Sequence, residues 1–231
     1  MNTDSGYAAD VQPPRWTLGK MQHPVRGFLH GAAALASVVV AVLLFRHAPS
    51  LPAKIGVLVF GIALVGLYAT SSLYHSVPWS QRAKRRMQRL DHSMIYVLIA
   101  GTYTPFALVA FTPPLRWIVL GLVWGIAAAG IVQKAFFPSF PGGFSVALST
   151  ALGWTGAFFA WPLLQVLDPT GLLVVAAGGI LYTVGMVFLV TNRPRLWPRV
   201  FSYHEAFHVL VVVASALHVF AVWRYVLPLA A

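Results

Sequence analysis

The sequence predicts an all-α integral membrane protein, a seven-transmembrane helix bundle. Of its 231 residues, 58% are hydrophobic and only 9% are charged, and the mean hydropathy is +0.75. A soluble globule of this size could not cover its surface with so few polar residues. Apolar runs of about 20 residues, each long enough to cross a hydrocarbon core of roughly 30 Å, recur from near residue 25 to the C-terminus. Most of the chain is therefore expected to face lipid or another helix.

Seven apolar runs lie between the proline, glycine and charged residues that interrupt the hydropathy pattern. They predict transmembrane helices over residues 25–45, 53–75, 90–111, 115–136, 143–164, 170–191 and 203–227. Gly153, Gly156 and Pro162 interrupt the fifth run, and its fusion with a neighbour would leave six helices. Residues 1–24 are polar and lack the apolar core of a cleavable signal peptide. We expect them to form a cytoplasmic N-terminal tail, followed by one membrane domain over residues 25–231.

Basic residues are divided unequally between the two ends of this predicted bundle. One end has Arg15, Lys20, Arg26, Arg82, Lys84, Arg85, Arg86, Arg89, Lys134, Arg193, Arg195 and Arg199, and the other has Arg46, Lys54, Arg116 and Arg224. Because cytoplasmic loops are enriched in Lys and Arg, this bias predicts a cytoplasmic N-terminus and an outside C-terminus. The same bias explains the formal charge of +11. Membrane lipid is therefore the expected partner, and nucleic acid is not.

The few polar groups inside the apolar runs are the first candidates for function, because burying ionisable groups in a bilayer costs several kcal/mol. These groups are Ser71 and His75 in the second run, Asp91 and His92 in the third, His204, Glu205, His208 and His218 in the seventh, and His30 in the first. The chain has no cysteine, which excludes disulfides, thiolate ligands and a cysteine nucleophile. Any metal would depend on histidine, carboxylate and water.

The spacing of these residues predicts a metal site. Ser71 and His75 are four positions apart, as are His204 and His208, so each pair shares one helix face at a separation of about 6 Å. Because successive helices alternate in direction, the second helix ends at the membrane face where the third and seventh begin. Asp91, at the start of the third helix, is therefore expected at the same depth. Three histidines and an exchangeable water form an open, catalytic type of zinc site. We expect His75, His204 and His208 to form it at the cytoplasmic end.

Simpler interpretations exist for the same side chains. Simple hydrogen bonding could account for the predicted cluster, and His23, His47 and His92 are expected to be interfacial or hydrogen-bonded. His218 is expected to line a cavity or make a packing hydrogen bond, because it lies about 21 Å along the helix axis from His204. The role of His30 is left open.

The two acidic residues also have alternatives. Asp91 could cap its helix or pair with Arg89. Glu205 lies about 100° around the helix from His204. It is expected to pack or to support a ligand from behind.

Three sequence elements together resemble a known family. They are Ser71-Ser72-Leu73-Tyr74-His75, the segment from Arg89-Leu90-Asp91-His92-Ser93 to Gly101-Thr102-Tyr103-Thr104-Pro105, and His204-Glu205-Ala206-Phe207-His208. In order and spacing the chain resembles the hemolysin III family, the bacterial branch of the progestin and adiponectin receptor family. It also shares the pattern of a wider membrane metal-hydrolase superfamily that includes alkaline ceramidases. The resemblance covers nearly the whole chain.

The resemblance implies that His75, His204 and His208 ligate zinc. It also implies that Asp91 holds a zinc-bound water and that Ser71 supports this water or the substrate. A bacterial relative of this kind is expected in the plasma membrane, as a multi-pass inner-membrane protein. The expected function is metal-dependent hydrolysis of an amide or ester in a lipid substrate.

Two other functions stay open at this stage. One is a receptor-like or regulatory protein of membrane homeostasis with a structural zinc. The other is a cytolysin, although the deep polar residues are too few to line an obvious aqueous path. The sequence indicates no oligomeric state.

Overall fold

The structure, a computed structural model, describes residues 18, 21, 23–137, 140, 142–197 and 200–231. The predicted tail over residues 1–24 falls almost entirely outside this range, as do the basic residues Arg15, Lys20 and Arg199. Within the described residues, seven segments are long and apolar enough to cross a membrane. The predicted all-α bundle and its seven spans are confirmed.

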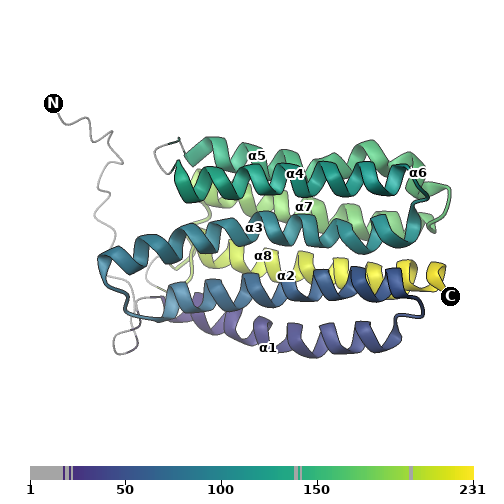
Figure 1. The fold of residues 1–231 in the computed structure, drawn as a ribbon. Helices are drawn as coiled ribbons and strands as arrows, with labels where there is room; N and C mark the ends of the chain where they lie inside the picture. Colours follow the sequence, from purple (N-terminus) through teal and green to yellow (C-terminus); the bar gives the residue numbers. More distant parts are fainter. Residues whose placement is uncertain (1–17, 19–20, 22, 138–139, 141, 198–199) are drawn as a thin grey trace.

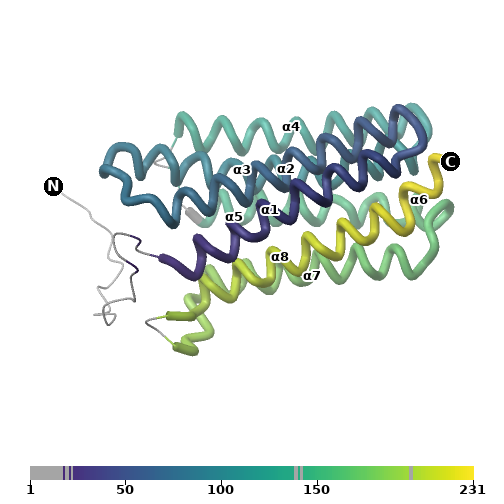
Figure 2. Tube along the Cα trace, turned by 90° about the horizontal axis from the view of Figure 1, so that it is seen from below, coloured from purple at the N-terminus to yellow at the C-terminus, as the bar shows by residue number. Residues whose placement is uncertain are grey.

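The helices follow one another as long antiparallel rods (Figure 1). They are α1 (Pro24–His47), α2 (Leu51–Ser76), α3 (Gln81–Ala110), α4 (Leu115–Phe136), α5 (Gly142–Trp154), η1 (Thr155–Phe159), α6 (Ala160–Leu164), α7 (Pro169–Thr191), α8 (Tyr203–Ala221), η2 (Val222–Val226) and η3 (Leu227–Ala230). The start of α1 and the C-terminus lie at opposite ends of the bundle. The end of α2 and the starts of α3 and α8 therefore share one end, as Figures 1 and 2 show.

Large apolar side chains cover the outside of the bundle. Leu35, Phe136 and Phe158 are 73%, 74% and 83% exposed, and many other leucines, valines and isoleucines are exposed with them. An apolar surface of this extent is unfavourable in water and is typical of helices that face lipid. The chain is therefore a multi-pass membrane protein, and the cytoplasmic location of its N-terminus stays a prediction.

Helix α3 begins nine positions before the predicted span at residue 90. Its first turn is capped by Ser80, whose hydroxyl accepts a hydrogen bond from the Ala83 backbone N–H at 3.4 Å. Residues 81–89 contain no proline or glycine and are rich in Arg, Lys and Gln, which all favour helix. The helix thus continues beyond the apolar run and carries a basic extension next to the end of α2.

The fifth span is broken where its glycines and proline predicted an interruption, in the 3-10 segment η1 between α5 and α6. The Tyr103 hydroxyl from α3 fills this break. It donates to the Gly153 carbonyl at 2.6 Å and accepts from the Gly156 N–H at 2.6 Å. Lipid offers no partner to exposed backbone groups, so irregular backbone at this depth has to be satisfied from inside the protein. Tyr103 supplies that partner.

Helices α2 and α3 pack closely enough that one glycine is required between them. A Cβ added at Gly56 would lie 2.7 Å from the Cα of Pro105. Both positions are buried in the core shared by the two helices. This contact holds α2 against α3, and these helices carry Ser71, His75 and Asp91.

Replacing Gly56 with Ala is expected to destabilise the protein by about 1–3 kcal/mol, because the new methyl group meets backbone rather than a side chain that could rotate away. The midpoint of thermal unfolding in detergent measures this effect. Gly125→Ala is the matched control, since Gly125 is exposed and an added Cβ there meets nothing within 4 Å. Because Ala favours helix over Gly by about 1 kcal/mol, the control midpoint should stay equal or rise. Equal effects of the two substitutions would contradict the packing argument.

Candidate metal centre

Three imidazole rings from two helices meet at one end of the bundle. His75 lies in the last turn of α2, and His204 and His208 lie in the first two turns of α8. One ring nitrogen from each residue lies within 4.8 Å of the other two. His75 and His208 are 5% and 2% exposed, and His204 is partly buried. The structure thus brings together the three histidines that the sequence predicted to meet.

The geometry of this cluster fits a divalent metal. Zinc with nitrogen ligands at 2.0–2.1 Å in a tetrahedron holds them about 3.3 Å apart, so modest side-chain rotations would close the cluster around one ion. The Nδ1 atom of His208 is buried and has no hydrogen-bond partner among the described residues. A buried unsatisfied nitrogen is costly, and ligation or an ordered water would remove that cost.

Ser71 and Asp91 form a polar pair next to the cluster. Ser71 is buried one turn before His75 on α2, and the Asp91 carboxyl group interacts with it from α3. Asp91 lies well inside α3, where Ser80 is the cap, so the alternative of a capping role is wrong. The other alternative partner, Arg89, donates to the Ala135 carbonyl at 3.3 Å. Asp91 is outside the three-residue group that could share an ion, so its predicted role beside the metal stays a prediction.

A buried ion pair supports the start of α8. The Arg26 Nε atom of α1 donates to Glu205 Oε1 at 2.7 Å, and both side chains are about 5% exposed or less. The second carboxylate oxygen of Glu205 accepts from the Ser202 N–H at 2.9 Å. Glu205 therefore holds the first turn of the helix that carries His204 and His208. This pair could not be predicted from the sequence, where Arg26 bears only on orientation, because the two residues are 179 positions apart.

His30 is a second feature that sequence reasoning did not place. Its ring stacks on that of His208 with the centroids 4.0 Å apart, and its edge meets the Tyr68 ring at 5.0 Å. It is 3% exposed, and neither ring nitrogen has a hydrogen-bond partner among the described residues. His30 thus packs directly against one of the three clustered histidines without belonging to their group.

Two other histidines have the simpler role expected from the sequence. His218 Nδ1 donates to the Ala214 carbonyl at 2.8 Å, and His47 Nδ1 donates to the Leu43 carbonyl at 2.8 Å. These hydrogen bonds stay within the helix of each residue. His218 and His47 are therefore structural, and neither belongs to the three-histidine group.

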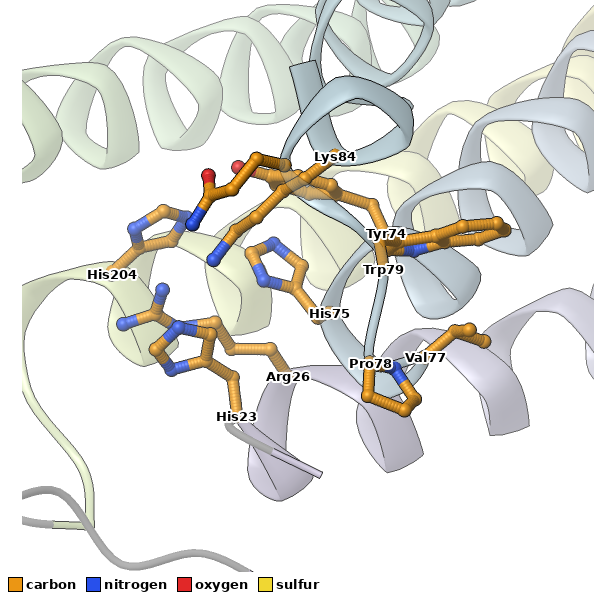
Figure 3. Close-up of a pocket in the computed structure, with 10 residues that line it drawn as sticks. His23, Arg26, Tyr74, His75, Val77, Pro78, Trp79, Lys84 and His204 are labelled. Atoms are coloured by element: carbon orange, nitrogen blue, oxygen red, sulfur yellow. The ribbon is translucent and has the colours of Figure 1, made fainter. Parts of the chain in front are cut away.

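A cavity of about 200 Å³ opens beside the cluster (Figure 3). Its lining residues are His23, Arg26, Tyr74, His75, Val77, Pro78, Trp79, Gln81, Lys84 and His204. Two of the three clustered histidines therefore border a space that a molecule could enter. His23, expected to be an interfacial histidine, lines this space as well and meets His75 edge to face at 5.7 Å.

Comparison with known proteins gives the same family as the sequence elements. A family model described as Haemolysin-III related matches residues 19–219. The chain is 36% identical to Hemolysin-3 of Bacillus cereus over 204 residues, which cover 87% of this chain and 90% of that protein. It is 34% identical to the Hemolysin-3 homolog of Bacillus subtilis (strain 168) over 199 residues, or 85% and 90% of the two chains.

A more distant relative is human. The Monocyte to macrophage differentiation factor of Homo sapiens is 24% identical over 208 residues, which cover 88% of this chain and 84% of that protein. The three-histidine cluster, the seven spans and the bacterial relatives agree with the resemblance recognised in the sequence. The chain belongs to the haemolysin-III related family.

Proposed function

We propose that this protein is a zinc-dependent membrane hydrolase that cleaves an amide or ester bond in a lipid. The observation that carries the proposal is the convergence of His75, His204 and His208, with one nitrogen of each within 4.8 Å of the others. Three protein ligands leave the fourth position of a tetrahedral zinc open, which is typical of catalytic rather than structural sites. The apolar outer surface favours a substrate that arrives from the membrane.

The chemistry follows from the groups around this cluster. Zinc, when bound, would supply polarisation of a substrate carbonyl and activation of a water molecule. In this proposal Asp91 takes the proton from the water and returns it to the leaving amine or alcohol as the carbonyl carbon–heteroatom bond breaks. Ser71, whose side chain interacts with the Asp91 carboxyl group, would help to orient it. His75 and His204 border the cavity beside the cluster, which would give the substrate access to them.

Replacing His208 with Ala is expected to reduce the zinc content of the purified protein from about one ion per chain to well below that, because two imidazoles bind zinc much more weakly than three. Elemental analysis of protein purified without added chelator measures the zinc content per chain. His47→Ala is the matched control, since His47 lies at the opposite end of α1 and hydrogen-bonds within its own helix. If the first substitution disturbs folding, His204→Ala tests a less buried ligand. Unchanged zinc content in both variants would show that these histidines do not form the zinc site.

Replacing Asp91 with Asn is expected to lower lipid hydrolysis by about 100-fold or more while zinc is retained, because an amide cannot accept the proton. The assay measures fatty acid released from a panel of lipid amides and esters, with and without chelator. Ser71→Ala, which removes only the partner of Asp91, should cause a smaller loss.

A structural metal in a receptor-like or regulatory protein is the second candidate. The observation that favours it is that the cluster joins α2 to α8 across the bundle, so a metal there would tie two helices together. In that case Asp91→Asn would reduce zinc content or thermal stability, and no lipid in the panel would be hydrolysed by the unaltered protein.

A further inference from the structure

Helix α1 lies against α8 through two residue pairs. Arg26 pairs with Glu205, and one turn further along both helices the His30 ring stacks on the His208 ring, with the centroids 4.0 Å apart and 24° between the planes. Arg26 and His30 are four positions apart on α1, and Glu205 and His208 are three apart on α8, so the two residues on each helix share one face. The buried ion pair therefore fixes which residue of α1 lies against His208, and that residue is a histidine.

A buried histidine at position 30 is unfavourable unless its ring nitrogens find partners. The side chain is 3% exposed, and neither ring nitrogen has a hydrogen-bond partner among the described residues. The His208 backbone is next to this ring but outside hydrogen-bonding geometry. Each buried nitrogen without a partner lowers stability, whereas an apolar side chain of similar size would not. The choice of histidine here indicates a contact that His30 makes when the metal centre is loaded.

His208 needs such a contact once it binds a metal. A histidine that ligates a metal through one nitrogen carries a proton on the other, and that N–H almost always donates to an acceptor, which fixes the ring and strengthens metal binding. Of the two His208 nitrogens, only Nδ1 is enclosed by protein without a partner among the described residues. An ion with an open fourth position needs space beside the nitrogen that binds it. In this arrangement Nε2 is the ligating atom and Nδ1–H is the donor.

The rings around His208 offer one suitable acceptor. In the part of the chain that the structure describes, these rings belong to His30, His75, His204 and Phe207. His75 and His204 would use their lone pairs on the metal, and phenylalanine has no acceptor nitrogen, whereas a neutral His30 has one. The three clustered nitrogens, up to 4.8 Å apart, have to move together around an ion. The same rotation of the His208 ring can turn its Nδ1 edge toward His30.

We propose that His30 is a positioning residue of the metal centre, whose neutral ring accepts a hydrogen bond from His208 Nδ1–H when His208 binds zinc through Nε2. The inference rests on the proposed function in one respect, because it needs zinc on the three histidines, but it does not need hydrolysis. His30 does not itself bind the ion, since it lies outside the group of three. It fixes the tautomer and orientation of His208, and so strengthens zinc binding at the expense of stability in the metal-free protein.

Two substitutions of similar size test the acceptor. His30→Leu removes both nitrogens, whereas His30→Gln keeps a side-chain oxygen that accepts, and neither keeps the aromatic ring. Zinc affinity of the purified full chain in detergent is measured by competition with a chromophoric chelator at constant pH. His30→Leu should weaken zinc binding by about 10- to 100-fold, the usual effect of losing such a partner, and His30→Gln should restore most of the affinity.

The metal-free protein should respond in the opposite direction. Without zinc, the midpoint of thermal unfolding of His30→Leu should equal or exceed that of the unaltered chain, since two buried nitrogens without partners are gone. A residue that serves packing alone would lower this midpoint and leave zinc affinity unchanged. Tyr68→Phe is the matched control, because it removes the buried hydroxyl that donates to Ser215 at 2.7 Å but keeps the ring edge against His30. It should leave zinc affinity unchanged.

Three results would overturn the proposal. Equal zinc affinity in His30→Leu and the unaltered chain would show that His30 does not support His208. Equal losses in His30→Leu and His30→Gln would assign the effect to the lost ring rather than to an acceptor. An equal loss in Tyr68→Phe would assign it to a general disturbance of the interior.

The zinc readout separates this inference from the hydrolase proposal. An unaltered chain that binds no zinc would reject the metal centre and both proposals with it. A chain whose zinc affinity depends on His30 but that hydrolyses no lipid amide or ester would retain this inference and reject the enzyme. A chain that hydrolyses lipid and whose zinc affinity is unaffected by His30→Leu would retain the enzyme and reject this inference.

Discussion

Polar side chains inside a membrane bundle have to find their partners within the protein, because lipid offers none. In this chain several of these partners gather at one end, where α2 stops and α3 and α8 start. Arg26 pairs there with Glu205, Asp91 contacts Ser71, and three imidazoles face one another. Glu205 also ties the pair to the first turn of α8. Each interaction compensates groups that would be costly alone, so the arrangement holds α1, α2, α3 and α8 together around the candidate site.

The parts of this arrangement that depend only on run length, helix direction and residue spacing could be predicted from the sequence. Apolar run length predicted seven spans, and alternating helix direction placed His75 at the same depth as His204 and His208. Helical spacing of four residues put the last two on one face. These inferences need no knowledge of how a helix is rotated about its axis, and the structure agrees with them. The same reasoning predicted the irregular fifth span from its glycines and proline.

The parts that depend on helix rotation and long-range pairing could not be predicted. Hydropathy shows where α3 enters the apolar layer, but it does not show where the backbone becomes helical. The span predicted from hydropathy therefore did not include the basic first turns of α3. The Arg26–Glu205 pair and the stacking of His30 on His208 join α1 to α8 over most of the chain length. Local spacing contains no signal for such contacts. The cytoplasmic N-terminus stays a prediction from the distribution of basic residues, since the fold is the same in either orientation.

The central claim is that three histidines from two distant helices hold one zinc ion with an open position. X-ray absorption at the zinc edge of the purified protein tests this most directly, because it reports the ligands around the metal. The spectrum is expected to show about three imidazole nitrogens at roughly 2.0–2.1 Å and one oxygen ligand. A protein that retains no metal, or a metal shell without imidazole, would contradict it.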